Sequence, residues 1–393
     1  MRVDLMTKEY PPEIYGGAGV HVTELVRALR EDIDVSVRCF GAPRSDTDTF
    51  AYEVPAQLVE ANATLGTLGV DLQMAQDAAG ADLVHSHTWY ANAAGHLAKM
   101  LHGIPHVVTA HSLEPLRPWK AEQLGGGYRV SSWIEKTAFE AADAVIAVSD
   151  GMRRDILRSY PALDESRVHT VYNGIDLDRW KPRLDADFVR GLGIDPDRPS
   201  VVFVGRITRQ KGLPYLLRAA ALLPPEVQLV LCAGAPDTPG ILAEVTAGVE
   251  ALQLQRSGVV WINRLLAQPE LAAVLSHGTV FVCPSIYEPL GIVNLEAMAC
   301  GLAVVGTATG GIPEVVADGQ TGRLVPIEQL TDGTGTPLRP EQFVADLARI
   351  LTEVVNDPSR AAEMGRAGRL RAEQVFGWSQ IATRTREIYA SLL

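Results

Sequence analysis

Two glutamates in the second half of the chain are spaced to bind hydroxyl groups. Glu288 and Glu296 follow an apolar stretch and are separated by seven residues. Pro289 and Gly291 favour a turn, and a helix is expected from Ile292 onward. Glu288 is then expected to project from a loop, and Glu296 to lie on the helix. Carboxylates accept hydrogen bonds from vicinal hydroxyls, so one glutamate suits a sugar and the other a ribose. The alternative is two glutamates placed by chance on one helix.

Two cations, Arg206 and Lys211, stand beside glycines directly after the apolar stretch 200–204. In open α/β sheets, ligands bind at the carboxyl ends of the strands. A planar guanidinium can bind two oxygens at once and an ammonium adds a compact charge, so this pair suits a diphosphate. The two charges would also offset the negative charge that grows on a departing phosphate. The alternative is a solvated basic turn.

The first half of the chain offers a glycine-rich turn and a histidine. Gly16 and Gly17 precede a helix expected from Val20, where backbone N–H groups can approach a phosphate at the positive end of the helix dipole. A tight turn that needs positive φ explains the glycines equally well. His111 directly follows an expected strand. It can hydrogen-bond a substrate hydroxyl or stabilise a cationic centre through a neighbouring carbonyl, and the alternative is a structural role.

The sequence predicts no metal site. His85 and His87 are expected to point to opposite faces of a strand, and no carboxylate or thiol beside them completes a ligand set. Three Asp-x-Asp pairs look like the motif of metal-dependent transferases, but they fall in or beside a linker rather than after a core strand. We interpret them as loop acids, at 176–178, 185–187 and 195–197.

The surrounding stretches alternate between short β-branched runs and longer amphipathic runs, which is typical of βα units feeding a parallel sheet. In the first half, elements are expected over 2–6, 20–29, 34–40, 82–85, 91–101, 106–109, 130–141 and 144–148. The alternation resumes over 200–204, 213–223, 227–232, 241–252, 259–262, 269–275, 280–283, 291–299 and 303–305. We predict an α/β protein with two facing, doubly wound, Rossmann-like domains and a cleft between them.

A polar, proline-bearing segment separates the two series, so we place the domains at 1–173 and 174–378. The residues from Pro340 onward favour helix, and the last stretch has apolar residues at helical spacing. The helix expected over 379–393 is a candidate to pack on the first domain.

Composition excludes several classes of protein. With 393 residues, 47% of them hydrophobic and 21% charged, the chain can bury two cores rather than stay disordered. A formal net charge of −12 argues against a nucleic-acid or anionic-membrane partner. No secretory signal and no membrane-length apolar run is recognised, so we expect a cytoplasmic protein. The four cysteines lack CxxC spacing and are expected to be core thiols.

Taken together, the glycine turn, His111, the Gly-Arg-x4-Lys-Gly run and the Glu-x7-Glu motif resemble the retaining GT-B glycosyltransferases of family 4, which include bacterial glycogen synthases and sucrose-phosphate synthases. The similarity spans nearly the whole chain. Stretches 9–21, 111–120 and 310–314 look closest to the actinobacterial glycogen synthases, regarded as making α-maltose 1-phosphate from ADP-glucose and glucose 1-phosphate. One departure is Ile14-Tyr15-Gly16-Gly17, where longer glycogen synthases carry Lys-Thr-Gly-Gly.

The resemblance implies a set of donor contacts. Gly16 and Gly17 would lie near the donor phosphates and the acceptor, and His111 would touch the donor sugar. Arg206 and Lys211 would hold the diphosphate. Glu288 would bind the transferred glucose and Glu296 the ribose, and the backbone amides of Leu290, Gly291, Ile292 and Val293 would assist in binding the donor. Such enzymes react on one face of the sugar through an oxocarbenium-like state. The leaving phosphate accepts the proton of the incoming hydroxyl, so neither a protein base nor a metal or other cofactor is expected.

The acceptor is less constrained. Arg117, Lys120 and Arg129 are candidates for a basic pocket that binds a sugar phosphate, although a solvated loop explains them equally well. We expect glucose transfer from ADP-glucose to glucose 1-phosphate or to an α-1,4-glucan, with small molecules as partners and a homodimer possible. The rivals are a glycolipid mannosyltransferase, which would profit from a basic amphipathic helix that does not stand out here, and a non-catalytic sugar-nucleotide-binding protein.

Overall fold

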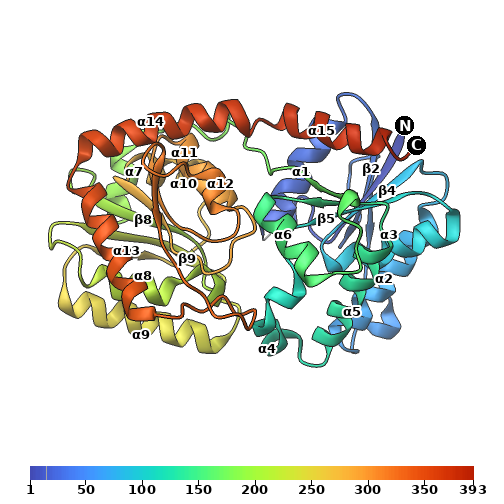
Figure 1. Cartoon of the computed structure of the whole chain (residues 1–393), viewed down its shortest axis with the longest axis horizontal. Coiled ribbons are helices and arrows are strands. Elements are labelled where there is room, and N and C mark those ends of the chain that lie inside the picture. Colours follow the sequence, from blue (N-terminus) through green and yellow to red (C-terminus); the bar gives the residue numbers. More distant parts are fainter. Residues whose placement is uncertain (15) are drawn as a thin grey trace. The chain divides into compact units, whose positions relative to one another are not determined.

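The computed structural model describes residues 1–14 and 16–393. Backbone contacts divide the chain into two compact units, Met1–Gly174 with Trp378–Leu393, and Ile175–Gly377 (Figure 1). The division falls within one residue of the predicted boundary at 173–174. The last residues of the chain therefore belong to the first unit and not to the unit that precedes them in sequence.

The first unit is built on a seven-stranded parallel sheet in the order β3-β2-β1-β4-β5-β6-β7. Its strands are β1 (Arg2–Thr7), β2 (Asp34–Phe40), β3 (Thr49–Tyr52), β4 (Leu83–His87), β5 (His106–Ala110), β6 (Ala144–Ala147) and β7 (Val168–Thr170). Its α-helices are α1 (Gly17–Leu29), α2 (Ala63–Asp77), α3 (Trp89–His102), α4 (Ala121–Leu124), α5 (Gly127–Ala141), α6 (Asp150–Ser159) and α15 (Trp378–Ala390).

The second unit contains a six-stranded parallel sheet in the order β10-β9-β8-β11-β12-β13. Its strands are β8 (Ser200–Arg206), β9 (Gln228–Gly234), β10 (Val259–Ile262), β11 (Val280–Cys283), β12 (Ala303–Thr307) and β13 (Gly322–Val325). Its α-helices are α7 (Ala186–Gly191), α8 (Leu213–Ala220), α9 (Pro239–Gln255), α10 (Gln268–Ser276), α11 (Ile292–Ala299), α12 (Ile312–Val315), α13 (Pro340–Val355) and α14 (Pro358–Val375).

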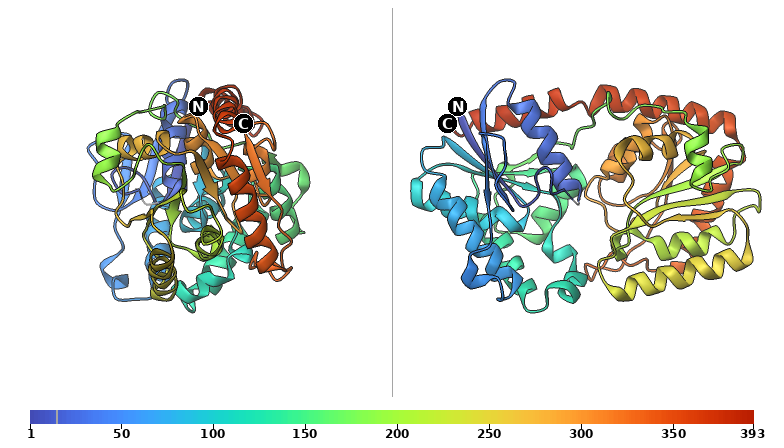
Figure 2. Two further views of the ribbon diagram at one scale, coloured as in Figure 1. Left: turned by 90° about the vertical axis from the view of Figure 1, so that its left-hand side faces the viewer. Right: turned by 180° about the vertical axis from the view of Figure 1, so that it is seen from behind.

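Both sheets follow the strand order of doubly wound dinucleotide-binding domains when each is counted from its own first strand. Helices cover both faces of each sheet (Figure 2). The prediction of two Rossmann-like α/β domains is confirmed. In such sheets the direction of winding reverses between the first and fourth strands, and ligands bind at the carboxyl ends there. That point lies after β1 and β4 in the first unit and after β8 and β11 in the second.

The central strands carry polar residues in unusual places. Every residue of β4 and β5 is buried, because helices cover these strands on both sides. Yet β4 ends in His85, Ser86 and His87, and β5 begins with His106. The Oγ of Ser86 lies 2.7 Å from Nε2 of His106, and burial lowers the pKa of His106 to about 3. The carboxyl end of β4 is thus an uncharged polar region inside the core.

One aspartate of each Asp-x-Asp pair accepts hydrogen bonds from nearby backbone N–H groups, as expected of loop acids, whereas Asp187 lies inside a helix. Oδ1 of Asp176 accepts hydrogen bonds from the backbone N–H groups of the residues two and three positions later. Oδ1 of Asp195 accepts from the N–H of Asp197. Asp185 is the N-cap of α7, a short helix absent from the sequence prediction, and its carboxylate accepts from the N–H of Phe188.

The C-terminal helix α15 completes the core of the first unit. It packs beside α1 (Figure 1), and Trp378, Ile381, Ile388 and Tyr389 are buried in the same cluster as β1 and β2. The hydroxyl of Tyr389 lies 2.6 Å from Nδ1 of His85. The last residues of the chain therefore contact the strand end that carries the buried histidines.

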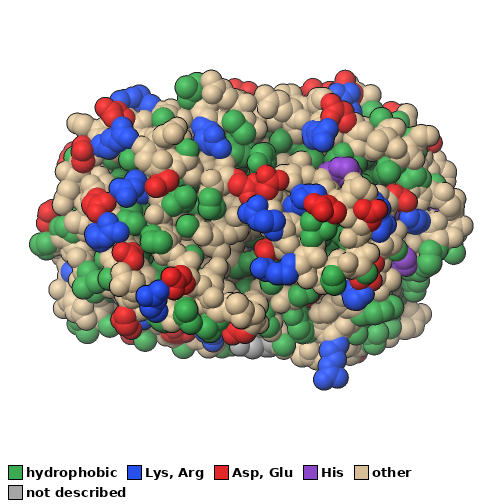
Figure 3. Space-filling model, in the orientation of Figure 1, with side chains coloured by type: hydrophobic (Ala, Val, Ile, Leu, Met, Phe, Trp, Pro, Cys, Tyr) green, Lys and Arg blue, Asp and Glu red, His purple; other side chains and the backbone are tan. Residues whose placement is uncertain are grey.

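We looked for a helix that could span a membrane and for a surface region of one charge sign. Within residues 1–14 and 16–393, none of the helices combines the length and apolarity needed to cross a bilayer. Acidic and basic side chains are interspersed on the face shown in Figure 3.

A buried carboxyl group in α2 yields a stability prediction. Asp71 is fully buried, and burial raises its pKa well above the usual value, although the backbone of Ala94 opposes this shift. A raised native pKa stabilises the fold only at low pH, and that stabilisation is lost as the pH rises. Asp71→Asn should therefore stabilise the protein by roughly 1–3 kcal/mol near neutral pH.

Urea unfolding at about pH 5 and about pH 8 tests this prediction. The advantage of Asp71→Asn over the parent chain should be larger at the higher pH, where an aspartate must either ionise in the core or hold a proton at a cost. An advantage that is equal at both pH values would contradict the assignment of a neutral Asp71 in the folded state.

Candidate functional site

The second unit joins Lys211 and Glu288, although 77 positions separate them in sequence. Lys211 lies on the turn after β8, and Glu288 on the loop after β11, at the point where the winding of the sheet reverses. Nζ of Lys211 donates to Oε2 of Glu288 at 2.6 Å. Burial acts to lower the pKa of Lys211, but the charge of Glu288 and the hydrogen bond to it outweigh burial and raise it. The lysine is therefore a cation, held by a carboxylate.

The loop of Glu288 is fixed by hydrogen bonds to neighbouring turns. The Oγ of Ser285 donates to Oε2 of Glu288 at 3.1 Å, and the N–H of Ile286 donates to the carbonyl of Gln210 at 2.8 Å. The N–H of Gly311 donates to the carbonyl of Glu288 at 3.0 Å. The turn of the lysine, the loop of the glutamate and the Gly310-Gly311 turn thus form one backbone network. This rigidity suits a site that must position substrate groups in advance.

Arg206 has a partner that sequence reasoning missed. Its Nη1 lies 2.9 Å from Oδ1 of Asp237, which follows β9, and its side chain remains 35% exposed. Asp237 orients the guanidinium without burying it. The position of Asp237 after a strand was a usable signal, but the pairing of β8 with β9 was needed to bring it near Arg206.

Glu296 lies on α11, whose N-cap is Gly291 with φ of 94° and no capping side chain. The first N–H groups of a helix have no partner within the helix, so those of Ile292 and Val293 suit an anion. Burial raises the pKa of Glu296 to about 7, and Lys211 partly opposes the shift. Arg206 and Lys211 interact electrostatically as well. The structure therefore brings together all of the residues predicted for the second domain.

The raised pKa of Glu296 predicts a pH profile. If the carboxylate accepts hydrogen bonds from ribose hydroxyls, kcat/KM for the donor should rise as the pH increases through about 7. Glu296→Gln should remove this limb and leave a flatter profile. Initial rates at low donor concentration, from about pH 6 to about pH 8, measure the effect. The same limb in the glutamine variant would assign the titration to another group.

The backbone of Gly310 packs closely against the backbone of Glu288, which gives a second prediction. Its φ is 56°, and a Cβ placed there would lie 2.0 Å from the carbonyl oxygen of Glu288. Gly310→Ala should displace the Glu288 loop, reduce kcat about tenfold or more and cost roughly 1–3 kcal/mol of stability. Gly319→Ala is the matched control, because Gly319 has φ of 72° but open space around it. Equal losses in both variants would mean that only backbone strain matters.

In the first unit, the glycine turn differs from the simplest expectation. The N–H of Gly16 donates to Oε2 of Glu9 at 2.7 Å, so a carboxylate of the chain itself occupies the position predicted for a donor phosphate. Tyr15 lies outside the described residues. Gly17 is the first residue of α1 and does not share this hydrogen bond. Gly16 has φ of −144° and Gly17 is helical, so neither glycine provides the tight turn with positive φ that was the alternative.

His111 belongs to a group of four histidines. Nδ1 of His87 lies 2.9 Å from Nε2 of His111, and the ring centroids of His21 and His111 are 4.7 Å apart. The expectation that His85 and His87 point to opposite faces was wrong. Positions two apart on a strand share a face, and these two rings lie 4.2 Å apart. His21 lies on the buried face of α1, and nothing in the sequence around it indicated that it would join the other histidines.

The predicted acceptor residues do not form one cluster. Arg117 donates from Nη1 to Oγ of Ser112 at 3.1 Å, and Lys120 is buried. Arg129 is exposed on α5, and among the residues that the structure describes no interaction joins it to Lys120. The prediction of a pocket made by all three residues is therefore not supported by this arrangement.

A different basic pair forms instead around Tyr90. Nζ of Lys8 lies 3.9 Å from the centroid of the Tyr90 ring, and Nζ of Lys120 lies 5.5 Å from it. Burial lowers the pKa of Lys8, and Glu9 partly offsets this. The electron-rich face of the ring attracts each ammonium, which keeps two positive groups on the same aromatic side chain. Lys8 directly follows β1, which was a signal that sequence reasoning did not use.

Lys120 is anchored by buried acids. Its Nζ lies 3.6 Å from Oε1 of Glu114, which is fully buried. Glu135 accepts a hydrogen bond from the N–H of Glu114 at 2.7 Å and another from the hydroxyl of Tyr160. Burial and the neighbouring charge of Glu114 raise the pKa of Glu135 to about 8. One negative charge therefore balances the ammonium of Lys120.

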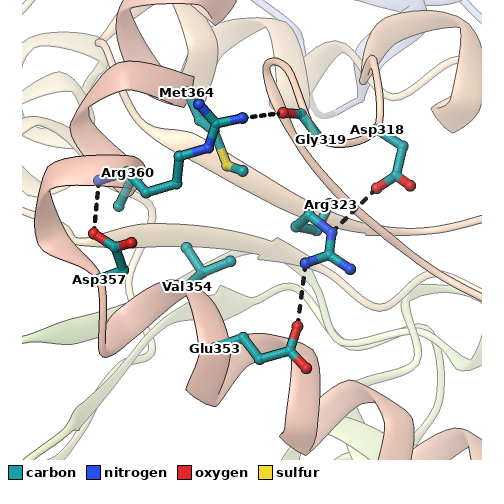
Figure 4. A pocket seen from close by; sticks show the side chains of 9 residues that line it. Asp318, Gly319, Arg323, Glu353, Val354, Asp357, Arg360 and Met364 are labelled. Atoms are coloured by element: carbon teal, nitrogen blue, oxygen red, sulfur yellow. Dashed lines mark hydrogen bonds and ion pairs between the residues drawn. The ribbon is translucent and has the colours of Figure 1, made fainter.

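A cavity of about 460 Å³ lies elsewhere in the second unit, between the start of β13 and helices α13 and α14. Arg323 points to Asp318 and Glu353 in Figure 4, and Arg360 donates to the carbonyl of Gly319. Its lining contains none of the predicted site residues. This cavity is therefore separate from the residues predicted to bind the donor.

Sequence comparisons identify related proteins along nearly the whole chain. Residues 15–179 match the family Glycosyltransferase Family 4, and residues 198–352 match Glycosyl transferases group 1. The chain is 59% identical to α-maltose-1-phosphate synthase of Mycolicibacterium smegmatis over 99% of both chains. It is 56% identical to the protein of the same name from Mycobacterium tuberculosis, again over 99% of both.

Solved structures show the same fold. Sucrose-phosphate synthase from Thermosynechococcus elongatus superimposes with a TM-score of 0.80 at 24% identity, covering 100% of this chain and 98% of the other. The catalytic domain of starch synthase IV from Arabidopsis thaliana gives 0.74 at 18% identity, with coverage of 99% and 98%. By sequence and by fold, this chain belongs to glycosyltransferase family 4, and it is an enzyme that transfers glycosyl groups from nucleotide sugars.

Proposed function

We propose that this enzyme transfers glucose from ADP-glucose to glucose 1-phosphate, with retention at the anomeric carbon, and forms α-maltose 1-phosphate. The observation that carries the proposal is the identity of 59% over nearly the full length with a protein named for that product. More distant relatives, about 30% identical, are named D-inositol 3-phosphate glycosyltransferases. Both names contain a phosphorylated small molecule, which favours a phosphorylated acceptor over a glucan or a glycolipid.

The second unit would hold the donor. We assign the diphosphate to Arg206 and Lys211 together with the N–H groups at the start of α11, because these are the positive groups at the carboxyl ends of β8 and β11. Glu288 would bind hydroxyls of the glucose, and Glu296 those of the ribose. Lys211 is paired with Glu288 in the structure, so the diphosphate would share this lysine with the carboxylate.

The reaction would need no protein base. The bond between the anomeric carbon and the leaving phosphate oxygen breaks, and a bond to the 4-hydroxyl oxygen of the acceptor glucose forms on the same face. The hydroxyl proton passes to the departing ADP. Lys211 and Arg206 would stabilise the charge that develops on that phosphate. We propose that this transfer requires no metal ion, so that chelators leave the rate unchanged.

The first unit would hold the acceptor. Lys8 and Lys120 at Tyr90 offer two positive charges at the carboxyl edge of the sheet, and we assign the phosphate of glucose 1-phosphate to them. The ion pair with buried Glu114 would hold the ammonium of Lys120 in place. His111 would contact the donor sugar. A cytoplasmic location and a homodimer stay predictions from sequence.

An acceptor screen tests the proposal. ADP-glucose and UDP-glucose are each offered with glucose 1-phosphate, glycogen or a lipid acceptor, and the products are identified by mass. We expect a hexose disaccharide phosphate from ADP-glucose and glucose 1-phosphate. Elongation of glycogen alone would assign the enzyme to glucan synthesis, and transfer only to lipid would overturn the assignment of the substrate. A reaction without enzyme serves as the blank.

A further inference from the structure

The first unit gathers three histidine side chains from separate elements. His21 comes from α1, His87 ends β4, and His111 follows β5. Each offers one ring nitrogen, and these three nitrogens all lie within 4.8 Å of one another. The ring centroids of His21 and His87 are 5.6 Å apart, and those of His87 and His111 are 5.2 Å apart. This cluster lies wholly inside one compact unit.

Several nitrogens of the cluster lack an ordinary hydrogen bond. Among residues 1–14 and 16–393, both ring nitrogens of His21 and Nε2 of His87 are buried without a partner of normal geometry. The side-chain amide of Asn173 approaches His21 and partly opposes the lowering of its pKa by burial. Buried polar atoms are nearly always satisfied, and an orphaned group calls for an explanation. Because a neutral imidazole carries one N–H and one lone pair, each of these two rings can offer one nitrogen to a ligand that accepts lone pairs.

The fourth histidine supports the cluster without being a ligand. Both ring nitrogens of His85 are engaged, Nδ1 with the hydroxyl of Tyr389 at 2.6 Å and Nε2 with Oγ1 of Thr109 at 2.7 Å. Its ring packs against His87 at 4.2 Å. His85 therefore limits the movement of the His87 ring, while its own nitrogens have no lone pair to offer.

The chemistry of the cluster suits a divalent transition metal. A neutral imidazole offers one lone pair, and histidine is the commonest protein ligand of such ions. Three imidazoles with one open position form a common zinc-binding arrangement, in which ligand nitrogens lie about 3.3 Å apart. The observed spread of up to 4.8 Å is somewhat larger, and rotation of the rings can close it.

We propose that His21, His87 and His111 form a binding site for a divalent transition metal such as zinc, with three nitrogen ligands and a fourth position open to solvent or a small ligand. The carboxyl ends of β4 and β5 place two of the ligands, and α1 brings the third. The proposed glycosyl transfer uses His111 to contact the donor sugar, so a bound ion would compete with that contact, but the existence of the site does not depend on that function.

Cobalt and zinc titrations of the full-length chain, prepared without a polyhistidine tag and treated with chelator, test the proposal. We expect one cobalt ion per chain, with visible d–d absorption of the intensity typical of four-coordinate cobalt. Calorimetry with zinc should give the same stoichiometry. A sulfur-to-cobalt charge-transfer band would place the ion on one of the buried cysteines and overturn the assignment.

Single substitutions locate the ion. His21→Asn and His87→Asn should each weaken zinc binding at least about tenfold, since the loss of even a supporting group costs 10- to 100-fold. His102→Ala is the matched control, because His102 also belongs to the first unit but hydrogen-bonds the carbonyl of Ala75 outside the cluster. Circular dichroism shows whether each variant folds.

A variant that fails to fold is replaced by His111→Asn, whose side chain is less buried. Zinc should raise the midpoint of thermal unfolding of the parent chain and of His102→Ala, but not of folded cluster variants. No cobalt spectrum in the parent chain would overturn the site. Undiminished binding in folded cluster variants, or an equal loss in His102→Ala, would do so as well.

Discussion

Lys211→Ala is expected to lower kcat by about 100-fold or more, because an ammonium that stabilises charge on the leaving phosphate acts mainly in the transition state. The structure adds a second consequence, since the substitution leaves Glu288 without the partner that lies 2.6 Å from it. Glu288 is 8% exposed in its side chain, and breaking a buried ion pair destabilises by up to about 3–5 kcal/mol. Steady-state kinetics and urea unfolding measure the two effects separately.

The control for this experiment lies on the same turn. Arg209 is two residues away, about half exposed, and paired loosely with Glu244 at 3.7 Å. Arg209→Ala should change kcat by less than about twofold, because an exposed ion pair contributes little. Unchanged turnover in folded Lys211→Ala would remove this lysine from the mechanism, and an equal loss in Arg209→Ala would show that the charge of the whole turn matters.

Glu288→Gln is expected to reduce kcat/KM by roughly 10- to 100-fold, the range expected when hydrogen bonds to a charged group become neutral ones. The glutamine keeps the shape of the side chain, and Ser285 can still approach it. The loss should appear with sugar donors but not in the affinity for ADP itself, which lacks the glucose. Weaker ADP binding would instead assign Glu288 to positioning Lys211.

A double variant resolves the coupling between the two residues. If Lys211 and Glu288 act as a unit, Lys211→Ala with Glu288→Gln should be only a few-fold less active than Lys211→Ala alone, because effects within one unit are not additive. The double variant should also recover part of the lost stability, since it buries no unpaired charge. Independent, multiplying losses in kcat would show that the two side chains contribute separately.

Much of the second unit could be predicted from local patterns. The apolar runs before Gly205 and before Ser285 are short, β-branched and followed by turn residues, so the strands β8 and β11 were recognisable. Residues that follow such strands meet at one edge of a parallel sheet. The convergence of Arg206, Lys211 and Glu288 therefore follows from strand assignment alone.

The first unit was harder to predict because its site depends on contacts between distant segments. Arg117, Lys120 and Arg129 are close in sequence, yet each has different surroundings, and it is Lys120 whose ammonium lies 5.5 Å from the Tyr90 ring. Lys8 joins it because β1 and β4 pair in the middle of the sheet. The backbone N–H of Gly16 donates to the carboxylate of Glu9, so a phosphate would have to compete with Glu9 for this hydrogen bond.

The sequence by itself determined the fold class, the domain boundary to within a residue, and the basic and acidic groups of the second unit, because strand periodicity and turn chemistry are local properties. Only the tertiary structure decided which groups are paired. It pairs Lys211 with Glu288, Arg206 with Asp237, and Lys120 with Glu114 as ion pairs. It also brought His21 to His87 and His111. Pairing of this kind depends on the distance between elements remote in sequence, and no local pattern carries that information.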